Sequence, residues 1–439
     1  MKTTCFNPAV LPLLSLWAAL LIMFGGDLPI QAAGNPVPQA PAFNVEAATR
    51  AYLDRIPPDK KARSDAYFEG GYWLQLWQFL YGAALALLLL QTGVSARMRN
   101  LACRLIRFKP LQTIVYAIQY LVLMALLSFP LTVYSDFFRE HKYGLANQNF
   151  GGWFWDWTKG LFVSIILGSL LMTVLFGVVR RVQRTWHIWG AAVTCAFMAL
   201  TIAIVPVFIA PLFNKYTLLS DPKVVDPILL LAHANGINTD KVFQMDASKQ
   251  TTRVSANVSG FLGTMRITLN DNLLNRCSQA EIEAVMAHEM GHYVLNHVFK
   301  LLVFFGIIII IGFLWLRWAS IGLLNRFGVR WGISGLGDVA VTPLMVLLFT
   351  SYLFVLTPIT NTIVRMHEIE ADMFGLNAAR QPDGFAEAAL KLAEYRKMEP
   401  GRIEEWIFYD HPSGATRIRT AMRWKAENLG PDSTSAAQK

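Results

Sequence analysis

The chain has 439 residues, of which 54% are hydrophobic and only 16% are charged. Soluble proteins carry about 25% charged residues, so the composition excludes a water-soluble, disordered or fibrous protein and indicates a polytopic membrane protein. Lys and Arg outnumber Asp and Glu by 39 to 30. In a membrane protein this excess belongs in cytoplasmic loops, and we expect no nucleic-acid partner. The four cysteines form no CxxC pair, so the sequence predicts neither a disulfide framework nor a cysteine metal site.

Long apolar stretches predict the membrane spans, because a spanning helix needs about 20 mostly apolar residues. Six stretches qualify: Tyr72–Ala96, Pro110–Ser135, Gly160–Val179, Ile188–Asn214, Leu301–Leu316 and Val339–Val364. A seventh, Thr3–Gly26, follows Lys2 and precedes the small residues Ala32 and Ala33. Residues 1–33 are therefore either a secretory signal peptide or a first transmembrane helix.

The spans divide the chain into segments. After residues 1–33 we expect an extracytoplasmic segment at 34–71 and an N-terminal membrane domain of four spans at 72–214. A metallopeptidase domain follows at 215–428, interrupted by spans at about 299–319 and 339–361, and the polar tail 429–439 is expected to be disordered. Basic residues gather in the loops after the first, third and fifth of the six spans, and the positive-inside rule makes this face cytoplasmic. Both polar blocks of the peptidase domain then share the opposite, extracytoplasmic side.

A metal-binding motif, HExxH, occupies residues 288–292. Upstream, Ser278 and Glu281 have the spacing of a capping box, so we expect a helix that begins near Ser278. The four-residue spacing places His288 and His292 on one helical face, where they can share one Zn²⁺. Glu289 then lies beside the open coordination position, where it can take a proton from the attacking water.

A catalytic zinc needs a third protein ligand, and the segment after the last span offers two carboxylates. Glu368 and Asp372 are four residues apart and share one helical face. One of them can bind the metal while the other orients a ligand histidine, and the spacing leaves open which does which. Glu370 and His367 point elsewhere on the helix, so we expect a solvated charge and a residue that is not a ligand.

Two further segments are candidates for substrate handling. The alternating apolar residues of Thr251–Leu269 predict a β-hairpin. Its edge strand could hold an extended peptide by β-augmentation, or the hairpin could be purely structural. Near the C-terminus, His411 and Arg417 could stabilise the oxyanion of a tetrahedral intermediate, although a histidine before a proline is more often an ordinary loop residue.

Taken together, these motifs resemble the zinc-dependent type I CaaX prenyl proteases, the a-factor-converting family of integral-membrane metallopeptidases. The resemblance rests on HExxH, on Arg365-x-x-Glu368-x-x-Ala371-Asp372, and on His411-Pro412 with the later Arg417. Further segments similar to the family occur in the same order along the chain: Arg139–Leu145, Pro206–Lys215, Gly260-Phe261, Arg266–Leu269 and Asp271.

The resemblance implies a mostly α-helical fold. Six or seven transmembrane helices would form an α barrel around a chamber, with a gluzincin-like zinc protease domain that carries a small β-hairpin. It also implies one Zn²⁺ per chain, bound by His288, His292 and Glu368. Glu289 would be the general base, Asp372 would orient a ligand histidine, and the transition state would be stabilised by His411 and Arg417.

Two departures from the family bear on the substrate. The edge strand reads Ser255-Ala256-Asn257, where the family often has Asn-Ala before an aromatic residue, so one contact with the substrate backbone is in question. The apparent signal peptide and the loop charges place the active side outside the cytoplasm, whereas eukaryotic relatives are expected to face the cytosol. We therefore expect a bacterial inner-membrane protein whose substrates are envelope proteins or peptides, with CaaX-type processing of lipidated proteins as the alternative.

Two rival interpretations make different demands on the sequence. An intramembrane site-2-type protease would carry HExxH within a spanning helix, but here Glu281, Glu283 and His297 flank the motif. A non-catalytic membrane chaperone or channel with a structural zinc would need four protein ligands and no open site. The sequence offers three ligands and a general base, which favours a metalloendopeptidase.

Overall fold

The computed structural model describes residues 43–260 and 265–429. Residues 44–439 belong to one compact unit, which contains every helix and strand described. The expected signal peptide or first span at 1–33 lies outside the described residues, and so does the tail from residue 430 onward.

In the part of the chain that the structure describes, five helical stretches are long and apolar enough to cross a membrane, and they coincide with the first five of the six predicted stretches. Helix α3 begins at Pro58, ahead of the predicted Tyr72, because hydropathy marks only the apolar part of a helix that also contains a charged first section. The elements of these stretches are α3 (Pro58–Gln91), α5 (Lys109–Val133) with η1 (Tyr134–Phe138) and α6 (Arg139–Lys142), α7 (Phe150–Arg181), α8 (Trp186–Ile204) with η2 (Val205–Ile209) and η3 (Ala210–Leu212), and α12 (His297–Phe327).

The sixth predicted span is broken in the middle. The turn η5 (Val339–Val341) and helix α13 (Thr342–Val355) are followed by helix α14 (Thr357–Ala379), and the two parts meet at an angle of 58°. The break falls where Pro358, in the first turn of α14, supplies no backbone N–H to continue the hydrogen bonds of α13. The bend separates the apolar half of the segment from α14, which carries the acidic candidates Glu368 and Asp372.

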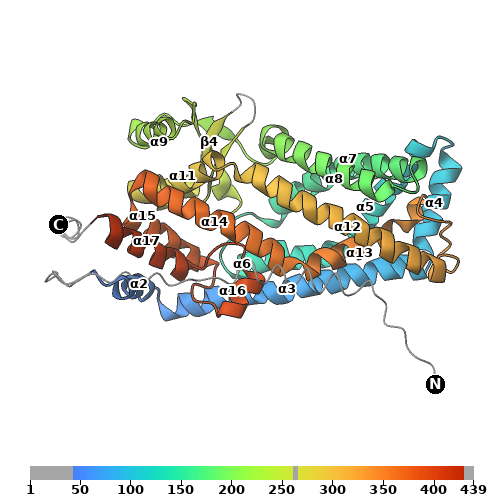
Figure 1. Cartoon of the computed structure of the whole chain (residues 1–439), viewed down its shortest axis with the longest axis horizontal. Helices are drawn as coiled ribbons and strands as arrows, with labels where there is room; N and C mark the ends of the chain where they lie inside the picture. The colour runs from blue at the N-terminus through green and yellow to red at the C-terminus, as the bar shows by residue number, and fades with distance from the viewer. Residues whose placement is uncertain (1–42, 261–264, 430–439) are drawn as a thin grey trace, which may run out of the picture. The chain divides into compact units, whose positions relative to one another are not determined.

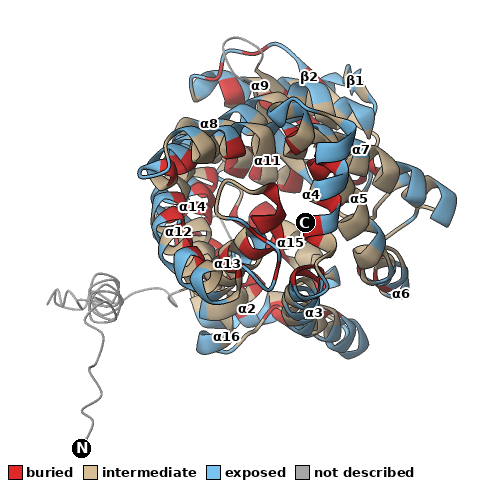
Figure 2. Ribbon diagram, turned by 90° about the vertical axis from the view of Figure 1, so that its right-hand side faces the viewer, coloured by how far each residue is buried: buried red, intermediate tan, exposed pale blue. Residues whose placement is uncertain are grey.

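Figure 2 shows α3, α5, α7, α8, α12 and α13 arranged in a ring, so the predicted helical barrel is confirmed. The helices pack through buried side chains such as Tyr116 and Leu344, which are fully inaccessible. Many large apolar side chains of the spans remain exposed, among them Phe162 and Phe208, as expected for helices that face lipid. The enclosed chamber remains a prediction.

The remaining elements gather at one end of the unit, on the left of Figure 1, while α4 (Val94–Leu105) lies at the other end. The two polar blocks of the sequence, 215–298 and the segment after Arg365, therefore share one end. Their helices are α9 (Pro222–Ala234), η4 (Ala247–Lys249), α10 (Asp271–Arg276), α11 (Gln279–Val294), α15 (Pro382–Lys391), η6 (Leu392–Glu394), α16 (Arg402–Phe408) and α17 (Gly414–Asn428), joined by α2 (Val45–Leu53) from the start of the unit.

The predicted hairpin is present as the outer half of a four-stranded sheet. The strands are β1 (Tyr216–Leu218), β2 (Val242–Met245), β3 (Ala256–Ser259) and β4 (Arg266–Asn270), in the order β1-β2-β4-β3. Strand β4 pairs with β3 in antiparallel fashion and with β2 in parallel. Alternate β4 residues Ile267 and Leu269 are buried against Ile282, Met286 and Met290 of α11. This packing leaves β3 as an outer strand beside the helix that carries HExxH.

Candidate metal centre

The HExxH helix begins as the sequence predicts. The Ser278 hydroxyl accepts a hydrogen bond from the Glu281 backbone N–H, and the Glu281 carboxylate accepts one from the Ser278 N–H, which completes the capping box. Helix α11 then holds the motif in its second half. Met286 and Met290 anchor one face of α11 to the sheet, so His288 and His292 lie on another face, toward α14.

Two glycines allow α11 and α14 to cross closely. A Cβ atom added to Gly375 of α14 would lie 2.9 Å from the backbone nitrogen of His288. A Cβ atom added to Gly291 of α11, inside the motif, would lie 3.2 Å from the Cα of Ala371. Since neither backbone atom can move without shifting its helix, any larger residue would push the two helices apart. The sequence analysis missed this function of the two glycines.

The crossing brings together the three ligands that the resemblance implies. His288 Nε2 lies 3.3 Å from Glu368 Oε2, and His292 Nε2 lies 3.4 Å from Glu368 Oε1. The two Nε2 atoms are 3.1 Å apart. All three ligand atoms fall within 4.8 Å of one another, with His288 and Glu368 buried and His292 half-buried. The geometry is that of a compact site for one metal ion.

Neighbouring side chains bind the other ring nitrogen of each histidine. His288 Nδ1 lies 2.8 Å from Asp372 Oδ1, and His292 Nδ1 lies 2.9 Å from His297 Nδ1. If both histidines donate from Nδ1, both Nε2 lone pairs point toward the Glu368 carboxylate. Among the described residues, Glu368 Oε2 has no hydrogen-bond partner. Two imidazoles and one carboxylate arranged in this way are a donor set that could hold a metal ion and that suits Zn²⁺.

A second group of residues, which sequence reasoning missed, supports His292. Asn296 adopts a left-handed conformation (φ 55°) between α11 and α12, which turns the chain so that His297 faces back onto His292. The opposite ring nitrogen of His297 lies 3.1 Å from Glu370 Oε2, and Lys300 donates to the same oxygen at 2.7 Å. Glu370, expected as a solvated charge, is thus half-exposed and bound to two partners. The only sequence signal was the position of His297 five residues after His292.

His367 is placed beside this group without facing the metal site. Its Nδ1 lies 2.7 Å from the Ile363 carbonyl oxygen, and its ring packs edge-on against His297 at 4.8 Å. The structure therefore places His367 apart from the three ligand atoms, as expected from its position on the helix.

Arg417 reaches the site through Asp372. Its guanidinium contacts both carboxylate oxygens of Asp372, with Nε 3.0 Å from Oδ2, and one terminal nitrogen lies 3.4 Å from His288 Nδ1. Asp372 and His288 are buried and Arg417 is mostly covered, so these charge-assisted hydrogen bonds hold the carboxylate in place. Two nitrogens of Arg417, which the sequence suggested as an oxyanion donor, are thus already engaged by Asp372.

His411 faces the opening of the site. Its Nε2 lies 3.3 Å from Glu368 Oε2, while its Nδ1 lies 2.8 Å from Asp410 Oδ1. The same Nδ1 lies 3.4 Å from a guanidinium nitrogen of Arg396, and Nε2 faces the space in front of Glu368. The structure therefore brings His411 to the site, although it lies 43 residues after Glu368.

A cavity of about 380 Å³ opens in front of these groups. Its wall includes Ala256 of β3, together with His288, Glu289, His411 and Arg417. Burial raises the pKa of Glu289 from its ordinary value of 4.5 to about 7, which suits a base that works near neutral pH. The cavity thus places a base, the metal ligands and an outer β-strand around one space.

A distant loop fixes the start of β3. Arg253, three residues before the strand, donates to the Glu140 carboxylate at 2.7 Å. The backbone N–H of Thr252 donates to the Leu145 carbonyl at 3.2 Å. Both acceptors belong to the segment Arg139–Leu145, which the sequence analysis noted only as similar to a family. This segment therefore fixes the residues that immediately precede β3, the strand in the cavity wall.

Comparisons with known proteins agree with this architecture. The family model described as the CAAX prenyl protease N-terminal domain with five membrane helices matches residues 44–215, and the model for peptidase family M48 matches residues 219–425. An uncharacterized metalloprotease of Bacillus subtilis, YhfN, is 28% identical over 76% of this chain and 78% of its own. CAAX prenyl protease 1 of Saccharomyces cerevisiae is 28% identical over 73% of this chain and 75% of its own.

The fold also resembles that of a solved structure. The crystal structure of Ste24p from S. mikatae superimposes with a TM-score of 0.70 at 23% identity, covering 86% of this chain and 94% of that one. The helical membrane barrel and the His-His-Glu cluster define a membrane zinc metalloprotease. The chain belongs to peptidase family M48, with the N-terminal membrane domain of the CAAX prenyl proteases.

Proposed function

We propose that His288, His292 and Glu368 bind one Zn²⁺ per chain and that the fourth coordination position serves catalysis. The observation that carries this proposal is the convergence of two imidazole Nε2 atoms on a carboxylate within 4.8 Å. Asp372 orients His288, and Arg417 in turn holds Asp372. Positioning groups of this kind commonly accompany zinc sites.

Zinc, when bound, polarises the scissile carbonyl and lowers the pKa of the attacking water. Glu289 takes a proton from that water and later delivers it to the leaving amine. His411 donates from Nε2 to the oxyanion that develops on the scissile carbonyl oxygen. The chain therefore supplies a base, an oxyanion donor and a rigid ligand set for hydrolysis of a peptide bond, which makes it a zinc metalloendopeptidase.

The substrate in this proposal is a peptide or protein segment that adds to β3 as an extra strand. Support comes from the outer position of β3 and from Ala256 in the cavity wall, since β-augmentation needs an unpaired strand edge. The name of the yeast relative suggests C-terminal processing of lipidated CaaX proteins. An active end outside the cytoplasm instead favours quality control of envelope proteins, and the experiment below separates the two.

The proposed location is a bacterial inner membrane with the active end extracytoplasmic. Support comes from the basic loops after α3, α7 and α12, which lie at the end opposite to the metal centre (Figure 1). Loops rich in Lys and Arg stay in the cytoplasm, so the metal centre would face the other side.

The test is hydrolysis of quenched peptides by detergent-purified protein, with zinc counted per chain. Wild type is compared with Glu289→Gln and with Glu283→Gln, which lies on the same helix but binds Gln381 away from the cavity. We expect one zinc in all three proteins and loss of cleavage only in Glu289→Gln. Cleavage retained by Glu289→Gln would contradict the mechanism. Each peptide is tested with and without a farnesylated CaaX end, and a strict need for the lipid would favour CaaX processing.

A further inference from the structure

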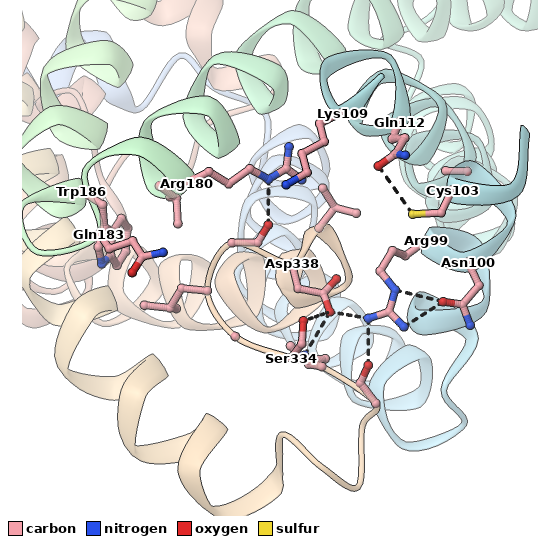
Figure 3. A pocket seen from close by; sticks show the side chains of 18 of the residues that line it. Arg99, Asn100, Cys103, Lys109, Gln112, Arg180, Gln183, Trp186, Ser334 and Asp338 are labelled. Carbon is pink, nitrogen blue, oxygen red and sulfur yellow. Dashed lines mark hydrogen bonds and ion pairs between the residues drawn. The ribbon is translucent and has the colours of Figure 1, made fainter. Parts of the chain in front are cut away.

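A second cavity, of about 970 Å³, is drawn from close by in Figure 3 and adjoins α4, the helix at the end of the unit opposite to the metal centre (Figure 1). It is bordered by α4, by the start of α5, by the end of α7 and by the loop before α13. Its polar wall includes Arg99, Lys109, Gln112, Arg180 and Asp338. No part of the proposed peptidase mechanism uses this cavity.

The segments around this cavity contain the whole net charge of the protein. Residues 92–112, 177–190 and 314–342 hold eleven basic side chains and one acidic side chain, Asp338, so their net charge is 11 − 1 = +10. The whole chain has 39 − 30 = +9, which leaves the remainder at −1. The eleven are Arg97, Arg99, Arg104, Arg107, Lys109, Arg180, Arg181, Arg184, Arg317, Arg326 and Arg330.

The single carboxylate of this end is already engaged. Asp338 binds Arg99 and accepts hydrogen bonds from the backbone and hydroxyl of Ser334. Arg180 donates only to neutral oxygens, the Gly337 carbonyl at 2.9 Å and the Thr113 hydroxyl at 3.1 Å. Within the described residues, neither Arg180 nor Lys109 has a carboxylate within 4.0 Å. Figure 3 shows both side chains extending into the cavity, which therefore presents two cations that have no direct carboxylate partner among the described residues.

The surroundings place this cavity at the level of lipid headgroups. Helix α4 exposes Leu105 beside Arg104, and Phe108 after it is also exposed, the pattern of a helix that lies in the membrane interface. Trp189 of α8 and Trp318 of α12 are more than half exposed near the same end. Exposed tryptophans mark the boundary between hydrocarbon and water. A ligand in the cavity would therefore come most readily from the bilayer.

We propose that this cavity binds the phosphate group of an anionic phospholipid. Lys109 and Arg180 would supply the compensating charge, with Gln112 as a neutral donor in the same wall. Basic pockets between transmembrane helices on the cytoplasmic side are suited to such headgroups. Inorganic phosphate shares this chemistry, but it has no acyl chain to contact exposed apolar residues near the cavity such as Leu105 and Phe108.

The test measures lipid binding to the detergent-purified full chain by native mass spectrometry. The probes are phosphatidylglycerol, phosphatidylcholine of the same chain length, and inorganic phosphate. We expect one saturable site for phosphatidylglycerol, with weaker binding of the zwitterionic lipid and of phosphate. Each cation near the membrane surface contributes about a fivefold factor in affinity. Lys109→Gln should therefore weaken phosphatidylglycerol about fivefold, and the double variant with Arg180→Gln about 25-fold.

The matched control is Arg104→Gln, which removes one exposed charge from the same end without lining the cavity. It should leave the saturable site unchanged. Equal weakening by Arg104→Gln and Lys109→Gln would show general surface attraction and overturn the proposal. Inorganic phosphate that binds as tightly as the lipid would overturn the lipid assignment. Lys109 is exposed, and in the described part of the chain only its backbone carbonyl makes a hydrogen bond, so Lys109→Gln keeps the test valid even if Arg180→Gln fails to fold.

Discussion

The contact between His297 and His292 gives the sharpest test of how the zinc ligands are positioned. His297 is almost fully buried, at 1% exposure, and its Nδ1 lies 2.9 Å from His292 Nδ1. His297→Leu keeps a side chain of similar size but removes the acceptor that fixes the His292 ring. We expect the protein to fold and to bind zinc more weakly.

The expected loss of zinc affinity follows from the hydrogen bond by which His297 supports His292. Loss of such a partner typically lowers metal affinity by 10- to 100-fold, or about 1.4–2.7 kcal/mol. Glu370→Gln should cost less than this range, because a Gln side-chain oxygen can still accept from His297 and the side chain is half-exposed. A larger loss of zinc affinity in His297→Leu than in Glu370→Gln would therefore support a series of hydrogen bonds in which Glu370 acts on His292 through His297.

The assay is a zinc dissociation constant from competition with a fluorescent chelator, measured beside a thermal melt. The control is His233→Leu, the same substitution at a histidine on α9 that is remote from the three ligand atoms. Zinc affinity should fall in His297→Leu and remain unchanged in the control. An unchanged dissociation constant for His297→Leu would refute the inference that this hydrogen bond orients His292.

Three further outcomes follow from the site. Gly375→Ala forces a Cβ to within 2.9 Å of the His288 backbone and should lower the free energy of unfolding by about 1–3 kcal/mol. The control Gly160→Ala has open space around the new Cβ and should leave the stability unchanged. Equal melting temperatures of the two variants would contradict the close crossing of α11 and α14. Arg417→Lys cannot keep both contacts to Asp372. Zinc affinity should therefore fall while the melting temperature changes little. An unchanged zinc affinity would show that Arg417 does not help to position His288 through Asp372. Burial raises the pKa of Glu289 to about 7, and a bound zinc ion would lower this pKa again. Because only the ionised base is active, kcat/KM should fall as pH decreases, with a midpoint above the ordinary 4.5. A pH–rate profile with its acid midpoint at or below 4.5 would contradict the effect of burial.

The sequence by itself determined the membrane character and the chemical nature of the site. Apolar stretches revealed five spans because a lipid-crossing helix must be apolar over its whole membrane length. The HExxH motif fixed the relative placement of its two histidines, since a four-residue spacing on one helix is a local property. The capping box of Ser278 and Glu281 was local in the same way and is present.

Only the tertiary structure decided how distant segments meet. The bend before Pro358 and the glycines that let α11 cross α14 bring Glu368 to the histidines, about eighty residues along the chain. His297 and Glu370 gained their positions from a left-handed turn at Asn296 and from that crossing, so the five-residue spacing from His292 to His297 did not by itself predict their contacts. The pocket of Lys109 and Arg180 likewise joins loops that are far apart in sequence, because the barrel gathers their ends at one side. Such contacts depend on helix packing, and a linear pattern does not encode them directly.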